Sequence, residues 1–319
     1  MDADHFETRR AIIMHTAILI NIVSASQPAI AMCVAGIVVF MIGAMVAKRD
    51  LSGAHGLDRI AVLGPVCFAV PLAVFGAFHL FGPDFVKDIV PDYMPWQMFW
   101  VYFVGLALIA ASVSIAAGIW MHWSGLLFGI MMFLFVAMIY IPGVISTPQG
   151  RYRWILACRE MSFGGGGWLL AGSVIDGWPR NGNRKVIFVG RICVTIALFL
   201  FGVEHFLHPT GLPGVPLQKQ IPTWIPGREI VDYITGAALL IAGGSVLLSW
   251  KTRAIAACVG GWILLTVLLI YGPVMIGALA DPEVGVQVEG INYFADTLLF
   301  AGTVLALAKV SPRSRQANS

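Results

Sequence analysis

Histidine, tyrosine, arginine and carboxylate side chains recur at matching places in an otherwise apolar chain. The phrase Phe-Gly-x-x-His occurs twice, ending at His79 and at His205, and a Pro stands four residues after each histidine. His, Tyr and Arg donate hydrogen bonds to carbonyl oxygens, and a neighbouring carboxylate can exchange protons. These residue types therefore predict a ligand-binding or proton-transfer site, provided that the fold brings them together.

The candidate residues form two sets of similar composition. The first set contains His79, Tyr102, Tyr140, Arg159 and Glu160. The second contains Glu204, His205, Tyr233, Tyr271 and Asp296, with Asp232 nearby. We predict cofactor binding for His79 and the four tyrosines, and catalytic roles for the other members of the two sets: Arg159, Glu160, Glu204, His205 and Asp296. If only one set is active, the second is favoured, because Glu204 precedes His205 whereas Phe78 precedes His79.

Structural roles compete with each of these assignments. Tyr at the ends of membrane spans is typical of the aromatic belt at the lipid interface. His79 and His205 could each bond a neighbouring carbonyl, and duplication copies packing as well as function. Arg159 and Glu160 could form a buried structural ion pair, but their side chains point about 100° apart on a helix. We therefore expect these two to serve different partners.

The elements that would position these residues are membrane-spanning helices. The chain has 319 residues, of which 58% are apolar and 12% charged, against about 25% charged in soluble domains. Lipid leaves helices as the only structure that satisfies the backbone of such apolar runs. Eight spans are expected at 60–81, 99–120, 124–142, 154–175, 187–208, 229–249, 254–277 and 290–309. A ninth is expected at Pro28–Ala47.

A long self-match divides the eight spans into two copies of four. The offset is 126 residues for the first span, 131 for the second and third, and 137 for the fourth, with the extra residues falling in loops. Because four crossings is an even number, both copies enter the membrane from the same side as parallel repeats. We thus predict an all-α, polytopic helical bundle: an N-terminal part (1–50), two repeats (51–177 and 178–310) and a tail (311–319).

Charge predicts the orientation. Twelve Lys and Arg residues lie in the 48–59, 177–191 and 250–253 loops and near the C-terminus, and six lie in the opposite loops. The positive-inside rule makes the first side, with the C-terminus, cytoplasmic in a bacterial-type inner membrane. The stretch Ala11–Ala25 could be one leg of a hairpin, which makes ten spans, or a signal-peptide core, although nearby acidic residues favour the hairpin.

Two further segments carry expectations about packing. The run Gly164–Gly167 in the fourth span predicts a close helix crossing, with a bent helix as the alternative. The outer loops Asp84–Met98 and Thr210–Arg228 are rich in Pro and Trp, so we expect both to lie on the outer interface as lids.

The two copies resemble the DoxX-like family of small four-helix membrane proteins. The resemblance rests on an Arg near the start of the first span (Arg59, Arg191), the Phe-Gly-x-x-His phrase, a Pro-x-x-x-Pro pair in the outer loop, and Gly-x-x-Leu in the second span. It covers about 59–309. The resemblance implies a membrane subunit of a quinone-linked oxidoreductase, with thiosulfate or another small sulfur compound as the substrate.

The residue types agree with quinone as the cofactor, held by the His, Tyr and Arg side chains. No CxxCH haem motif, zinc-type cysteine pair or phosphate-binding loop occurs in the sequence, so no haem, metal or nucleotide is expected. The expected partners are the lipid bilayer and a protein at the outer face, without nucleic acid. A non-enzymatic scaffold or receptor is the alternative function, and a small-solute transporter is a further one.

Overall fold

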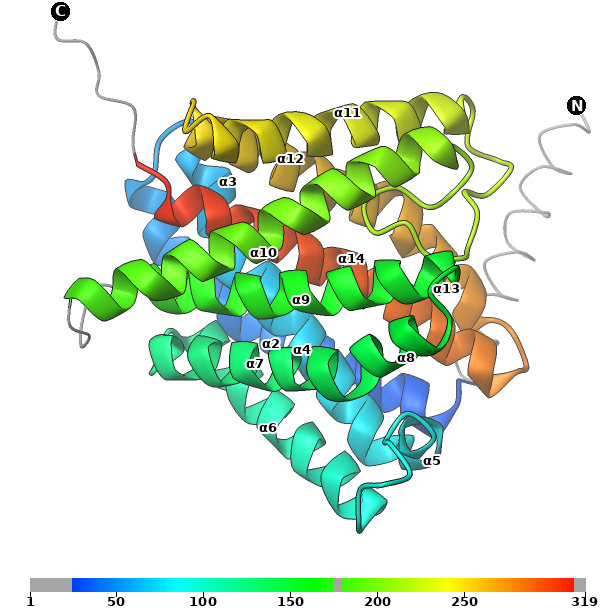
Figure 1. The fold of residues 1–319 in the computed structure, drawn as a ribbon. Helices are drawn as coiled ribbons and strands as arrows, with labels where there is room; N and C mark the ends of the chain where they lie inside the picture. The colour runs from blue at the N-terminus through cyan, green and yellow to red at the C-terminus, as the bar shows by residue number, and fades with distance from the viewer. Residues whose placement is uncertain (1–24, 175–179, 313–319) are drawn as a thin grey trace, which may run out of the picture.

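The computed structural model describes residues 25–174 and 180–312, which form an all-α bundle without a strand (Figure 1). Residues 11–24, on which the hairpin and signal-peptide alternatives depend, and most of the tail lie outside the described residues. The helices are α2 (Gln27–Gly53), α3 (Asp58–Val62), α4 (Gly64–Phe81), α5 (Pro83–Lys87), α6 (Gln97–Ala117), α7 (Met121–Phe135), α8 (Ile141–Ser146), α9 (Arg151–Gly172), α10 (Arg180–Leu207), α11 (Arg228–Leu247), α12 (Thr252–Thr266), α13 (Gly272–Leu279) and α14 (Val284–Val310), with two π-helical turns, η1 (Val136–Tyr140) and η2 (Val267–Tyr271).

Eight helices of the described chain are long and apolar enough to cross a membrane, as expected for an integral membrane protein. They include α2, the predicted ninth span, but not α9, which corresponds to the span expected at 154–175. Arg159, Glu160 and the four consecutive glycines lower the hydropathy of α9. It is still a continuous helix of 22 residues that packs against α7, α10 and α14.

The bundle has an inner group of helices between two outer pairs. Figure 1 shows α4, α9, α10 and α14 in the middle, with α6 and α7 on one side and α11 and α12 on the other. The closest inner pairings are α9 with α10 and α4 with α14. Large apolar side chains such as Leu106 and Leu247 are exposed on the outer helices, which suits a surface in contact with lipid tails.

The same break in helical geometry occurs once in each half. The turn η1 interrupts the helix after Phe135, and η2 interrupts it after Thr266, 131 residues later. A proline follows both turns closely, at Pro142 and Pro273. Proline has no N–H to donate to the preceding turn, so the helix widens there. Both breaks end at a tyrosine, Tyr140 or Tyr271, and set the position of that side chain.

Glycine allows the inner helices to approach closely, as the Gly164–Gly167 run predicts. A Cβ added at Gly165 of α9 would lie 2.8 Å from Cys193 Cβ and 2.9 Å from the Gly190 carbonyl oxygen of α10. A Cβ at Gly302 of α14 would lie 2.7 Å from the Phe68 nitrogen of α4. The two crossings join corresponding positions of the halves, and α9 is not unwound at either end of its glycine run.

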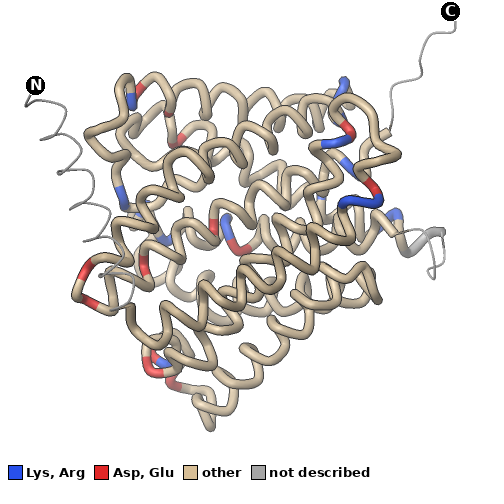
Figure 2. Tube along the Cα trace, turned by 180° about the vertical axis from the view of Figure 1, so that it is seen from behind, with Lys and Arg blue, Asp and Glu red and all other residues tan. Residues whose placement is uncertain are grey.

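Charged positions gather mainly at the two ends of the bundle, and one small group of acidic and basic positions lies in the middle (Figure 2). Charge inside a membrane bundle is expensive, so such groups usually pair with one another or face a cavity.

Candidate functional site

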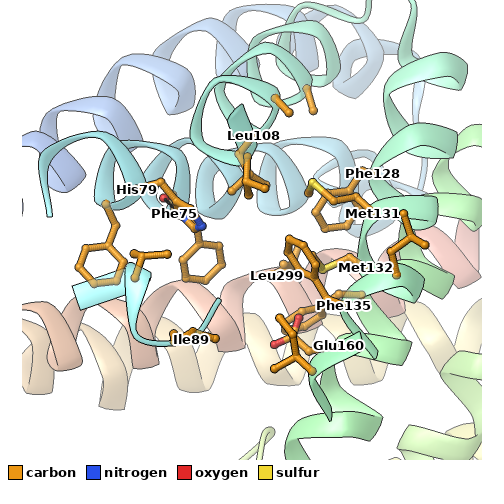
Figure 3. Close-up of a pocket in the computed structure, with 18 of the residues that line it drawn as sticks. Phe75, His79, Ile89, Leu108, Phe128, Met131, Met132, Phe135, Glu160 and Leu299 are labelled. Carbon is orange, nitrogen blue, oxygen red and sulfur yellow. Dashed lines mark hydrogen bonds between the residues drawn. The ribbon is translucent and has the colours of Figure 1, made fainter. Parts of the chain in front are cut away.

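A cavity of 1410 Å³ lies between α4, α6, α7 and α9 of the first half and α14 of the second, and Leu217 and Gln218 of the second-half loop also line it. We call it the first-half cavity, because four of its five helices belong to that half. Its walls are mainly apolar, and Leu108, Phe128 and Met132 lie along it (Figure 3). Phe103 of α6 and Leu127 of α7 also line it and are 52% and 60% exposed. The cavity therefore opens to the outside between these two helices, which diverge from the turn that joins them (Figure 1).

An ion-pair cluster forms part of the cavity wall where α9 meets α14. The guanidinium of Arg159 donates to both carboxyl groups beside it: Nη1 lies 2.7 Å from Asp296 Oδ2, and Nη2 lies 2.5 Å from Glu160 Oε1. All three side chains line the cavity and are 14% exposed or less. Arg159 and Glu160 do have different partners on facing helices, Asp296 and Tyr140 respectively, as expected, but they also bond each other.

Tyr140 and His79 add hydrogen-bonding groups to the same cavity wall. The Tyr140 hydroxyl, placed by η1, donates to Glu160 Oε1 over 3.3 Å. His79 Nδ1 donates to the Phe75 carbonyl oxygen over 2.7 Å, one turn back in α4. Because Nδ1 carries the proton, Nε2 of the neutral ring is free to accept a hydrogen bond. Figure 3 shows His79 and Glu160 on opposite sides of the cavity.

The cluster has one cation for two carboxyl groups. Arg159 bonds both Glu160 and Asp296, and buried charges of this kind need compensating partners. The chemistry open to this cluster is therefore hydrogen bonding to a ligand in the cavity, with the carboxyl groups as candidates for proton exchange.

Five of the ten predicted site residues do not line the cavity, and three of these are Tyr102, Tyr233 and Glu204. Tyr102 is 42% exposed on the outside of α6 and does not line the cavity. Tyr233 is 39% exposed and stacks on Phe206. Glu204 accepts a hydrogen bond from Arg151 over 2.5 Å and pairs with His208. The pairing of Glu204 beside His205 in sequence therefore does not make a common site, because the two side chains have different partners.

The other predicted residues of the second half are buried in contact with its outer loop. The Tyr271 hydroxyl donates to the Pro213 carbonyl oxygen over 2.9 Å, and the Gly214 N–H donates to His205 Nε2 over 2.9 Å. Asp232 Oδ1 lies 3.6 Å from the same histidine nitrogen, and neither Asp232 oxygen has a hydrogen-bond partner in the described part of the chain. Asp296, predicted to join this set, lies instead in the first-half cluster.

The two outer loops differ from the expected pair of lids. In the first half, α5 and the turns after it lie beside the cavity, with Ile89 in its wall. In the second half, Leu212 and Val215 have no exposed surface and lie among the helices. Sequence reasoning missed this insertion, although the five residues by which this loop exceeds its counterpart were a signal that it occupies additional space.

Comparison with known proteins gives no identification: no family model matches the chain, and no match was found among the curated proteins or the solved structures. The DoxX-like resemblance accordingly stays a prediction.

Proposed function

We propose that this protein is the quinone-binding membrane subunit of an oxidoreductase, and that the quinone occupies the cavity of the first half. The observation that carries the proposal is an apolar cavity that opens between two lipid-facing helices and contains a buried cluster of Arg159, Glu160 and Asp296. A lipid-soluble molecule with a polar ring needs these two features together.

The size of the cavity favours a lipid-like ligand. Pockets for small ligands usually measure about 300–1,000 Å³, and this one measures 1410 Å³. Its lining runs along α6 and the following turn from Trp100 to Trp120, which is roughly 30 Å at the helical rise. An isoprenoid tail fits along such a wall, and its ring reaches the polar groups of α9 and α14.

The residues of the cavity have separate roles in this proposal. Tyr140 can donate to a ring carbonyl and His79 Nε2 can accept from a ring hydroxyl, and both residues line the cavity. Glu160 and Asp296 exchange protons with the bound ring, and Arg159 keeps the two carboxyl groups in position. Electrons come from a partner protein at the outer face, for which the resemblance implies a small sulfur compound as the reductant.

Quinone binding is tested directly with a short-chain quinone titrated into the purified protein in detergent. Trp100 and Trp120 line the cavity, so a bound quinone is expected to quench tryptophan fluorescence saturably. Ala111→Trp fills the cavity from α6 and should abolish saturable quenching. Leu106→Trp places the same side chain on the 61% exposed, non-lining face of α6 and should leave binding unchanged.

The oxidoreductase role needs a second measurement. Membranes that contain the protein and its partners are expected to reduce quinone when thiosulfate is added, and Ala111→Trp should remove this activity. Saturable quinone binding without substrate-dependent reduction would support the proposed binding site and contradict thiosulfate as the substrate. Absence of saturable binding in the wild-type protein would reject the proposal as a whole.

A further inference from the structure

The outer loop of the second half indicates which chemical groups a ligand of the first-half cavity needs. Its segment Leu212–Pro216 lies inside the bundle, and a single peptide group at its centre makes two hydrogen bonds. The C=O of Pro213 accepts from the Tyr271 hydroxyl, and the N–H of Gly214 donates to His205 Nε2, each over 2.9 Å. This peptide group thus acts as an acceptor toward tyrosine and a donor toward histidine.

The neighbours of this peptide group correspond to residues that line the cavity. At the offsets of 126 and 131, His205 matches His79 and Tyr271 matches Tyr140. A Cβ at Gly214 would contact Thr297 and Ile263. At the offsets of 137 and 131, these match Glu160 and Met132, which also line the cavity. The loop of the second half therefore occupies the place that corresponds to the open cavity of the first.

The two histidines are held in the same way by their own helices. His205 Nδ1 donates to the carbonyl oxygen one turn back, at Phe201, over 2.6 Å, and His79 Nδ1 makes the same bond to Phe75 over 2.7 Å. This fixes Nε2 as the acceptor of the neutral ring in both halves. His205 Nε2 receives an N–H from the loop, and the described part of the chain supplies no such donor to His79 Nε2.

We propose that the ligand of the first half binds through a hydroxyl group that donates to His79 Nε2 and a second oxygen that accepts from the Tyr140 hydroxyl, as the N–H and the C=O of the loop peptide do in the second half. This inference rests on the proposed function and makes it more specific. A quinone supplies the acceptor for Tyr140 but no hydrogen for His79, whereas a quinol, with a hydroxyl at each end of its ring, supplies both. The cavity therefore selects the reduced form, and Tyr140 redirects its hydroxyl from Glu160 to the ligand.

A redox-inert pair of probes tests this selection: a long-chain 4-alkylphenol and its methyl ether, which accepts but cannot donate. One net hydrogen bond corresponds to about fivefold to tenfold in affinity, and we expect the phenol to bind more tightly by this factor. His79→Phe should remove the preference, and His79→Gln, which keeps an acceptor, should restore part of it. Tyr140→Phe should leave the preference for the phenol in place, because the single oxygen of each probe lies at His79. His122→Phe and Tyr102→Phe lie outside the cavity lining and serve as matched controls.

The outcomes separate this inference from the function on which it rests. Equal binding of phenol and ether by the wild-type protein, or a preference that persists in His79→Phe, would overturn the hydroxyl contact even if quinone binds. A phenol preference that depends on His79, in a protein that binds neither quinone nor quinol, would support the contact and reject the quinone. Thermal unfolding of each variant shows whether lost binding reflects lost structure.

Discussion

Arg159 and Asp296 occupy corresponding positions of the two halves, 137 residues apart in the chain, and form an ion pair with a 2.7 Å contact. The pair lies where α9 meets α14, so a basic residue of one half is neutralised by an acidic residue of the other. Two identical halves could not make this contact, since they would place like charges together. The divergence of this one position therefore stabilises the association of the halves and also forms part of the cavity wall.

Removal of Arg159 is expected to cost more stability than removal of Asp296. Arg159→Met leaves two buried carboxyl groups without their cation, and loss of one partner of a buried pair costs about 3–5 kcal/mol. Asp296→Asn leaves Arg159 bonded to Glu160 and should cost clearly less. Thermal unfolding in detergent measures both. Equal effects would mean that Glu160 does not stabilise the guanidinium on its own.

The sequence predicts the repeat and the types of the site residues, but it does not predict which residues of the two halves contact each other. The offsets aligned His79 with His205 and Tyr140 with Tyr271, and the structure places each tyrosine at the end of a π-helical turn. Nothing in a linear pattern gives the rotation that places Asp296 against Arg159. Contacts between residues more than a hundred positions apart depend on packing, which the glycines of α9 and α14 permit without specifying.

The insertion of the second-half loop was unpredictable for a different physical reason. Leu212 and Val215 are apolar, and apolar residues suit a lipid interface as well as a bundle interior. Inside the bundle, one peptide group of this loop is bonded to His205 and Tyr271, two residues that the sequence analysis assigned to catalysis and to cofactor binding. Their bonding capacity was recognised correctly, while the identity of the bonded group was a matter of tertiary structure.

Loss of either bond to the loop should release it. His205→Phe and Tyr271→Phe each leave one buried backbone group without its partner, which costs about 1–3 kcal/mol. Because both side chains hold the same peptide group, the double variant should cost less than the sum of the single ones. Limited proteolysis of the 208–227 loop and thermal unfolding report the effect.

Tyr233→Phe is the matched control for that pair, because this tyrosine is 39% exposed and stacks on Phe206. It should change neither proteolysis nor unfolding. Strict additivity of the His205 and Tyr271 variants would contradict a shared peptide group as their common partner.

The glycine crossings predict a graded set of alanine variants. Gly302→Ala places a methyl group 2.7 Å from the backbone nitrogen of Phe68. Because the contact is with backbone, α4 or α14 must shift to relieve it. We expect a destabilisation of about 1–3 kcal/mol, typical of overpacked cores. Gly165→Ala meets Cys193 and Gly190 at 2.8 and 2.9 Å and should behave similarly. Thermal unfolding of the purified variants measures both effects.

Gly244 provides the control for these crossings. It lies within α11, and a Cβ there has no heavy atom within 4 Å. Gly244→Ala should therefore be neutral or slightly stabilising, since alanine is the better helix former. A comparable loss of stability in all three variants would show that helix flexibility, and not close approach, explains the glycines.

Replacement of Asp232 by an apolar residue is expected to stabilise the protein, whereas the variants above, apart from the controls, destabilise it. Its carboxyl group has no exposed surface and makes no well-formed hydrogen bond in the described part of the chain, because the nearby Gly211 N–H donates to the His208 carbonyl oxygen. Val101 stands at the corresponding place in the first half. A buried polar group without a partner costs about 1–3 kcal/mol. Asp232→Val should therefore raise the unfolding temperature, whereas Asp232→Lys, which keeps a charge there, should lower it. A loss of stability in Asp232→Val would show that the carboxyl group supports His205 or the loop across the 3.6 Å gap.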